Sequence, residues 1–157
     1  MEDAIKTTAE YREAERLPRL YETHTDPDRE ICADCDVPEV IKQEPVTQKS
    51  PAQWAYERTV IYLKKFEEGL DNDHEVAMGF VGGDAGVLRI EGMGYFDPDI
   101  VTFYGSDGAG GRTQLVQHVS QLNVMFRALP KAVQGEAPTR IGFRLVEDLE
   151  RSEASET

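Results

Sequence analysis

The chain has 157 residues and a formal net charge of −13, which is enough for one domain with extensions. The charge is unevenly spread: residues 1–50 hold 13 acidic and 7 basic residues, residues 51–146 hold 12 and 9, and residues 147–157 hold 5 and 1. A uniformly acidic surface would repel nucleic acid and anionic membranes, whereas acidic ends on a nearly balanced middle leave room for a local basic patch.

The sequence has no apolar run near the roughly 20 residues that a membrane helix needs, and the N-terminus lacks the apolar region of a secretory signal. Its two cysteines, Cys32 and Cys35, are too close in sequence to staple a fold, which is typical of a reducing compartment. We therefore expect a soluble protein of the bacterial cytoplasm with no membrane partner.

Residues 1–49 are expected to form an acidic, mostly disordered arm, because their apolar residues are scattered and prolines interrupt them. Thr7 to Glu10 resembles a capping box, which predicts a short helix ending near Leu17. The predicted domain spans residues 50–147 and begins with a helix over residues 51–70, since Ser50 suits the N-cap, Pro51 the first helical position and Gln53 the third.

After this helix the hydrophobic period changes from helical to alternating, which predicts strands. The predicted strands are residues 75–81, 87–95, 100–104, 113–119, 121–129 and 139–146. The segment 121–129 also fits a short helix capped by Ser120, but its alternating apolar residues favour a strand. The sequence predicts an α+β fold: an N-terminal helix, then a strongly bent antiparallel sheet of five or six strands forming a small barrel, and an acidic disordered tail over residues 148–157.

One part of this domain resembles the Sm/LSm fold, in its Hfq-like RNA chaperone branch. Gly92, the pair Phe96-Asp97 and the apolar run Ile100–Phe103 are similar to the first motif of that family, and Gln117-His118 followed by Leu122–Pro130 is similar to the second. The resemblance covers roughly residues 51–130. Two positions differ, since Gln117 replaces a lysine of the family and Asp99 replaces an aromatic residue.

The resemblance implies RNA or a nucleotide-like anion as ligand, and assembly into rings by pairing the fourth strand of one copy with the fifth strand of the next. It places Leu115, Val119, Leu122 and Val124 on those edges, and Gln117 and His118 at the ligand. Arg89, Arg112 and Arg127 carry positive charge on the predicted sheet, and they would add to an anion site if they converge.

The chain as a whole also resembles an uncharacterised bacterial family that is known only as a domain of unknown function. The phrases WAYER, at residues 54–58, and HVSQLNV, at residues 118–124, carry that likeness. It implies no activity.

Several short patterns have both a chemical and a plain structural interpretation. His24, Cys32 and Cys35 could be three zinc ligands, but a fourth is missing, and no defined role is favoured. The run Asp71–Glu75 could bind a divalent cation, although a solvated helix end is favoured. The stretch Gly105–Thr113 superficially resembles a phosphate-binding loop, but a strand rather than a helix is expected after it, so a hairpin loop is favoured.

No group of residues has the spacing of a catalytic site, and no cofactor is expected. His118 has no orienting acid or nucleophile that spacing identifies, which favours a structural or interface histidine over a catalytic one. We expect a non-enzymatic binding protein that forms homo-oligomers and binds RNA or a nucleotide-like anion. The alternative is an acidic protein–protein interaction module or inhibitor that mimics nucleic acid towards a basic partner.

Overall fold

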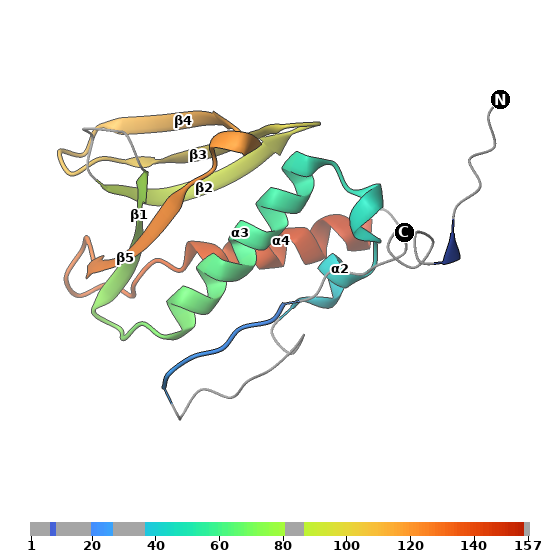
Figure 1. Cartoon of the computed structure of the whole chain (residues 1–157). Helices are drawn as coiled ribbons and strands as arrows, with labels where there is room; N and C mark the ends of the chain where they lie inside the picture. The colour runs from blue at the N-terminus through green and yellow to red at the C-terminus, as the bar shows by residue number, and fades with distance from the viewer. Residues whose placement is uncertain (1–6, 9–19, 27–36, 81–86, 156–157) are drawn as a thin grey trace.

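Figure 1 shows the computed structural model, which describes residues 7–8, 20–26, 37–80 and 87–155. Two helices lie against one face of a five-stranded antiparallel sheet. The mixed α+β class is therefore confirmed. The short helix predicted to end near Leu17 falls mostly outside the described residues, as do Cys32 and Cys35.

The main helix is not the first element of the chain, which corrects the predicted N-terminal position. It follows the short helix α2 (Glu39–Lys42) and the 3-10 turn η1 (Val46–Gln48). Both lie in the segment that we expected to be an arm. Ile41 of α2 is 1% exposed and packs with Leu20, Val37 and Ile61. This small apolar cluster attaches the segment to the main helix.

A buried ion pair adds to this attachment. Lys49 Nζ lies 2.6 Å from Glu57 Oε1 and donates to the carbonyl of Ile41 at 2.6 Å. Both charged side chains are almost fully buried, so each depends on the other for compensation.

The main helix α3 (Pro51–Glu68) begins as the sequence predicts. The backbone N–H of Gln53 donates to Ser50 Oγ at 3.0 Å, and Pro51 occupies the first turn. Its core face includes Tyr56, Val60 and Leu63, which are buried in the main hydrophobic cluster. The helix ends before Gly69, close to the predicted boundary.

The sheet consists of β1 (His74–Phe80), β2 (Val87–Phe96), β3 (Ile100–Ser106), β4 (Arg112–His118) and β5 (Val124–Pro130). Its strand order is β4-β3-β2-β1-β5, and every pairing is antiparallel. β1 and β5 cross steeply to the other three strands, so the sheet is strongly bent (Figure 1). It stays open because β4 and β5 are its two edges, and the predicted closed barrel is wrong.

The ambiguous segment 121–129 is mainly a strand. The 3-10 turn η2 (Val119–Gln121) follows β4, and β5 then pairs with β1 along its full length. The favoured interpretation is confirmed, with the strand beginning at Val124.

The predicted sixth strand at residues 139–146 is wrong, because a helix, α4 (Ile141–Ser155), occupies this place. Ile141, Leu145 and Val146 are buried, and Leu149 packs beside them, at the spacing of one helix face. Ile141, Phe143 and Leu145 also alternate, which misled the strand prediction. The helix takes in most of the expected tail as well.

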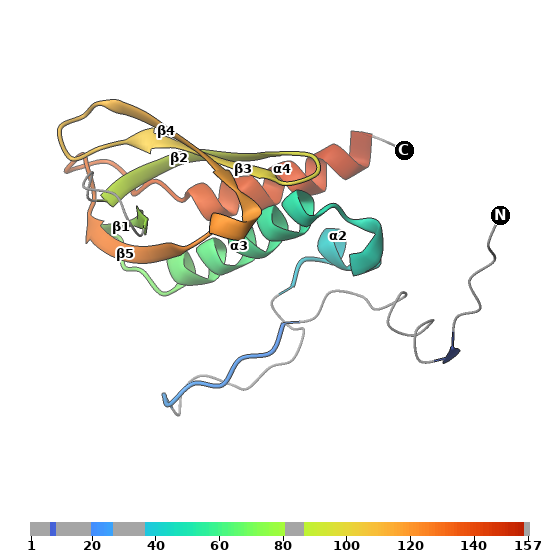
Figure 2. The ribbon, with the colours of Figure 1, turned by 45° about the horizontal axis from the view of Figure 1, so that its top comes forward.

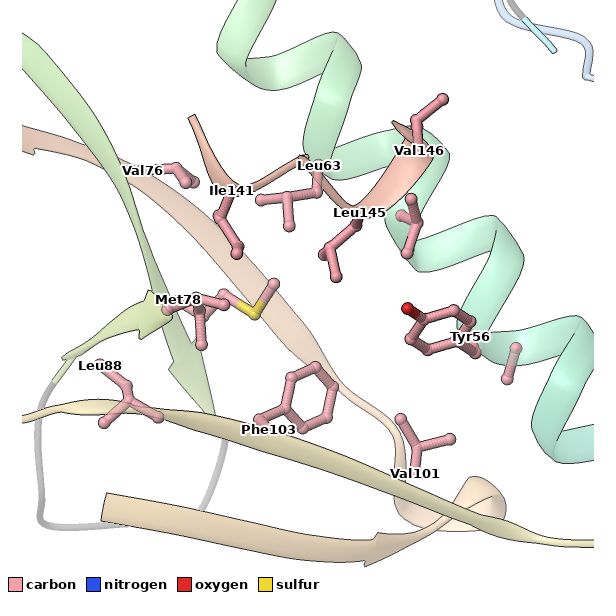
Figure 3. Close-up of a cluster of buried hydrophobic side chains, with 13 residues drawn as sticks. Tyr56, Leu63, Val76, Met78, Leu88, Val101, Phe103, Ile141, Leu145 and Val146 are labelled. Atoms are coloured by element: carbon pink, nitrogen blue, oxygen red, sulfur yellow. The ribbon is translucent and has the colours of Figure 1, made fainter. Parts of the chain in front are cut away.

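The core lies between the two helices and the inner face of the sheet. Figure 3 shows Met78, Phe103, Ile141 and Leu145 pointing toward one another from β1, β3 and α4. Val60, Leu63, Met78, Val101 and Phe103 are fully buried. Figure 2 shows α3 and α4 running together beneath the sheet, which leaves the opposite sheet face without a helix.

The two helices approach closely at Gly142. A Cβ there would lie 2.7 Å from the backbone nitrogen of Lys64, which is far inside van der Waals contact. A side chain at this position would push α4 away from α3.

Candidate anion-binding face

The strands present alternate side chains to two faces. The inner face holds the core, and we call the helix-free face the outer face. Phe96, Tyr104, Val116 and Met125 on the outer face or along its edges are exposed by 75%, 43%, 59% and 59%. The outer face is therefore the solvent-accessible surface of the sheet.

Strand register aligns three arginines across this outer face. Arg127 on β5 is paired with Ala77 on β1, and Ala77 is paired in turn with Arg89 on β2. Arg89 is paired with Ser106 on β3, which is paired with Arg112 on β4. We call Arg127, Arg89 and Arg112 the arginine row. Because neighbouring strands are about 4.8 Å apart, successive arginine backbones in the row are about 10 Å apart.

The middle arginine is held in place and the outer two are not. Arg89 Nη1 lies 3.2 Å from Glu75 Oε2, and its Nη2 donates to the carbonyl of Pro130 at 2.9 Å. Within the part of the chain that the structure describes, Arg112 and Arg127 have no ion pair or hydrogen bond through their side chains. Two unpaired guanidinium groups thus flank a fixed one.

A shallow hollow lies beside Arg112 on the outer face, with a volume of about 510 Å³. Tyr104, Gln114 and Glu91 contribute to its lining. The Tyr104 side chain packs over Gly92, where a Cβ would be 3.7 Å from the ring. An aromatic ring, a guanidinium and an amide thus line one hollow together with the carboxylate of Glu91. Sequence reasoning missed Tyr104 and Gln114, since only the register places them beside Arg112.

The structure does not bring Gln117 and His118 to the arginine row. Arg112 and His118 stand at opposite ends of β4, about 20 Å apart. Gln117 is paired with Val101 and points to the inner face, where its Oε1 is buried without a hydrogen-bond partner among the described residues. The predicted five-residue ligand site is thus divided among three places.

His118 has a structural role at the corner between β4 and β5. Its Nδ1 accepts from the backbone N–H of Ser120 at 3.1 Å and lies 2.7 Å from Ser120 Oγ. With Nδ1 accepting, Nε2 carries the proton and faces Asp99 Oδ2 at 3.0 Å. Both side chains are over 40% exposed, so this contact lies at the surface.

The turn between β2 and β3 joins this corner to α3. The Ser50 hydroxyl donates to Asp97, and the backbone N–H of Ala52 donates to the carbonyl of Pro98 at 2.9 Å. The backbone N–H of Val119 donates to the carbonyl of Asp99 at 2.9 Å. The Phe-Asp turn that the sequence singled out thus holds the start of α3 against η2.

The residues expected on sheet edges divide into two pairs. Leu115 lies on β4 and Val124 on β5, which are the two edge strands. Val119 lies in η2 and Leu122 in the bend before β5, so neither belongs to an edge strand.

The candidate metal ligands are not brought together among the residues that the structure describes, where no group of three or more His, Cys, Asp or Glu could hold an ion. His24 Nε2 lies 3.0 Å from Glu22, which also binds Lys65 at 2.6 Å. Asp71 accepts from the backbone N–H of Asp73 and lies 2.7 Å from His74 Nδ1. Each of these two histidines therefore faces a carboxylate.

The glycine-rich stretch Gly105–Thr113 forms the hairpin between β3 and β4. Asp107 Oδ1 accepts from the backbone N–H groups of Ala109 and Gly111 at 2.9 and 2.8 Å, which shapes the turn. A strand follows, so the hairpin interpretation is confirmed. Among the described helices, none combines the length and apolar character needed to cross a bilayer.

Glu67 is a buried carboxylate that the sequence did not single out. It is 1% exposed on α3, and its Oε1 accepts from the backbone N–H of Gly142 at the start of α4. Burial raises the pKa of Glu67 to about 7, although the Gly142 N–H and the charge of Arg140 oppose the rise. Its Oε2 has no hydrogen-bond partner among the described residues.

Comparison with known proteins identifies the family of the chain. A model described as a family of unknown function (DUF6173) matches residues 41–144, and the chain belongs to this family. The match runs from the end of α2 to the first turn of α4. Neither a curated protein nor a solved structure matches the chain.

Proposed function

We propose that this chain is a non-enzymatic, Sm-like binding protein that assembles with copies of itself and binds RNA on the outer face of its sheet. The observation that carries the RNA part is the arginine row, since three guanidinium groups share one face in one register. The row carries positive charge on a chain whose total charge is −13.

The strand order supports self-assembly. β4 and β5 are the two edge strands, as the Sm-like resemblance implies for the strands that pair between copies. Each has seven residues, and neither has a lysine or an internal proline to block pairing. Pairing β4 of one copy with β5 of the next would satisfy both edges and, repeated, would close a ring.

The spacing of the arginine row supports a polyanion as ligand. A single strand of RNA that crosses the sheet perpendicular to its strands would meet a guanidinium about every 10 Å. Tyr104, exposed beside Arg112, offers a ring on which a base can stack. Arg112 and Arg127 hold the free donors for phosphate oxygens.

The test is filter binding of the full chain to a single-stranded RNA oligomer over a series of salt concentrations. The triple variant Arg89→Gln, Arg112→Gln, Arg127→Gln should bind at least tenfold more weakly at low salt. The slope of log K against log salt should fall by about 1.4, because Arg112 and Arg127 hold the free donors and each lost phosphate contact on a single strand removes about 0.7.

The control is Arg144→Gln, which removes one exposed positive charge from α4, away from the outer face. It should leave both affinity and salt slope close to those of the unmodified chain. Absence of binding by the unmodified chain at low salt would exclude RNA as the ligand, and equal losses in both variants would exclude the arginine row as its site.

One observation favours the alternative function, an acidic module for a basic partner. α4 exposes Glu147, Asp148 and Glu150 on its solvent side. Changing these three residues to Gln or Asn should abolish binding to a basic partner under the alternative, whereas it should strengthen RNA binding under the leading proposal, because repulsion of phosphate falls.

A further inference from the structure

A second concave surface lies away from the arginine row, between the start of α3 and η2. We call it the Trp54 groove; it has a volume of about 530 Å³, and its walls include Val46, Trp54, Ala55, Arg58, Val119 and Leu122. The hydrogen bonds from Ala52 and Val119 to the β2–β3 turn fix its two sides relative to each other.

The groove unites two distant stretches of sequence. Residues 54–58 form one side and residues 118–124 contribute the other, and these are the two phrases that carry the likeness to the uncharacterised family. Neither phrase lies in the arginine row. The groove therefore has no part in the RNA site proposed above.

The walls are mainly apolar, and they carry one available positive charge. The Arg58 guanidinium lies over the Trp54 ring, with its central carbon 4.5 Å from the ring centroid, and its Nε donates to the carbonyl of Trp54 at 3.3 Å. These contacts hold the guanidinium in one orientation and leave Nη1 and Nη2 available. No described carboxylate forms an ion pair with it.

The other cation of the groove is already neutralised. Lys49 lies 5.3 Å from the Trp54 ring, but Glu57 binds its ammonium group. Partial desolvation lowers the pKa of the Arg58 guanidinium below its usual value, and the side chain stays exposed to solvent. A carboxylate bound there would supply the missing charge partner.

We infer that the Trp54 groove binds a small amphipathic carboxylate. The apolar part of the ligand lies between Val46, Ala55 and Leu122, and its carboxylate accepts two hydrogen bonds from Nη1 and Nη2 of Arg58. Small-molecule sites have volumes of about 300–1,000 Å³ and mostly apolar walls with few polar groups, and this groove fits that description.

Trp54 is the single tryptophan of the chain, so its fluorescence reports directly on the groove. The experiment titrates the full chain with octanoate and, in parallel, with 1-octanol, which has the same chain length and no charge. Octanoate should give a saturable change with a half-saturation concentration at least tenfold below that of 1-octanol, because a charge-assisted bidentate contact is worth at least that factor.

The matched variants separate this site from the arginine row. Arg58→Gln should remove the preference for octanoate, and Arg58→Lys should keep part of it, because a lysine retains the charge without the planar fork. Arg127→Gln should keep the preference in full. Calorimetric titration repeats each comparison, since Arg58 itself contacts the fluorescent ring, and circular dichroism checks that each variant is folded.

Three results would overturn the inference: no saturable response to octanoate, equal responses to octanoate and 1-octanol, or an unchanged preference in both folded Arg58 variants. RNA binding by Arg58→Gln should match that of the unmodified chain. The carboxylate site in the Trp54 groove and the RNA site are thus tested independently of each other.

Discussion

Glu67 is a residue whose protonation is coupled to the fold. Its carboxylate is buried between α3 and α4 and caps a backbone N–H at the start of α4. Because its folded-state pKa of about 7 lies above the ordinary value of 4.5, the folded state binds this proton more tightly than the unfolded state. Its stabilising effect is full below pH 4.5 and is lost as the pH rises through about 7.

Replacing Glu67 by glutamine should remove this pH dependence. A shift from 4.5 to about 7 corresponds to about 3 kcal/mol between the two limits. Denaturant unfolding at pH 5, 6, 7 and 8 should show the unmodified chain losing stability with rising pH from this group. The Glu67→Gln variant should lose less by about 2.5 kcal/mol, the part of that difference that falls between pH 5 and pH 8.

The exposed neighbour Glu68 provides the control. Glu68→Gln should keep the pH dependence of the unmodified chain, because that side chain is exposed. An identical pH dependence in Glu67→Gln and the unmodified chain would show that Glu67 is ionised in the fold at neutral pH.

At the scale of elements, the edge strands β4 and β5 determine how copies meet. Val116 on β4 and Met125 on β5 are each 59% exposed, so a polar residue at either position disturbs no packing within one copy. A lysine on an edge opposes strand pairing, because the partner strand would have to desolvate its charge.

Val116→Lys and Met125→Lys should therefore each shift the chain toward monomers. Each should leave the free energy of unfolding within about 0.5 kcal/mol of the original. Size-exclusion chromatography and circular dichroism measure the two effects. Gln114→Lys places the same charge on the same edge strand as Val116→Lys, and it should have the same effect. If all three variants assemble like the unmodified chain, pairing does not use these edges.

The sequence predicted the elements whose signals are local and missed those that depend on packing. Ser50, Pro51 and Gln53 define the start of α3 by themselves, and glycine and Asp-Pro turns separate the strands. Residues 139–146 fit a strand and a helix equally well. Their contacts with α3 decide for the helix, and no local signal reveals those contacts.

The arginine row could not be predicted from spacing. The register between β2 and β3 shifts between Ile90 and Gly92, and a one-residue slip would send Arg89 to the inner face. The sequence identified all three arginines as candidates, but only the pairing of five strands aligns them. The Sm-like resemblance is what placed Gln117 and His118 at the ligand, whereas in the structure they lie at the end of β4 opposite to Arg112.

At the scale of the whole molecule, the outer face and α4 expose different sets of charges, although Glu75 and Glu91 also lie beside the arginine row. The outer face of the sheet carries the arginine row, whereas α4 on the other side of the core exposes acidic residues. Copies joined through β4 and β5 would extend one sheet, so their arginine rows would multiply on a shared surface. Assembly would therefore raise the affinity of a basic patch that is small in a single copy.

Static light scattering of the full chain at neutral pH is the most direct test of self-assembly through the sheet edges. One copy has a mass of 17.6 kDa. Pairing of β4 with β5 between copies predicts a single species whose mass is a fixed multiple of that value, as in a closed ring. A mass of 17.6 kDa that does not change with protein concentration would contradict it.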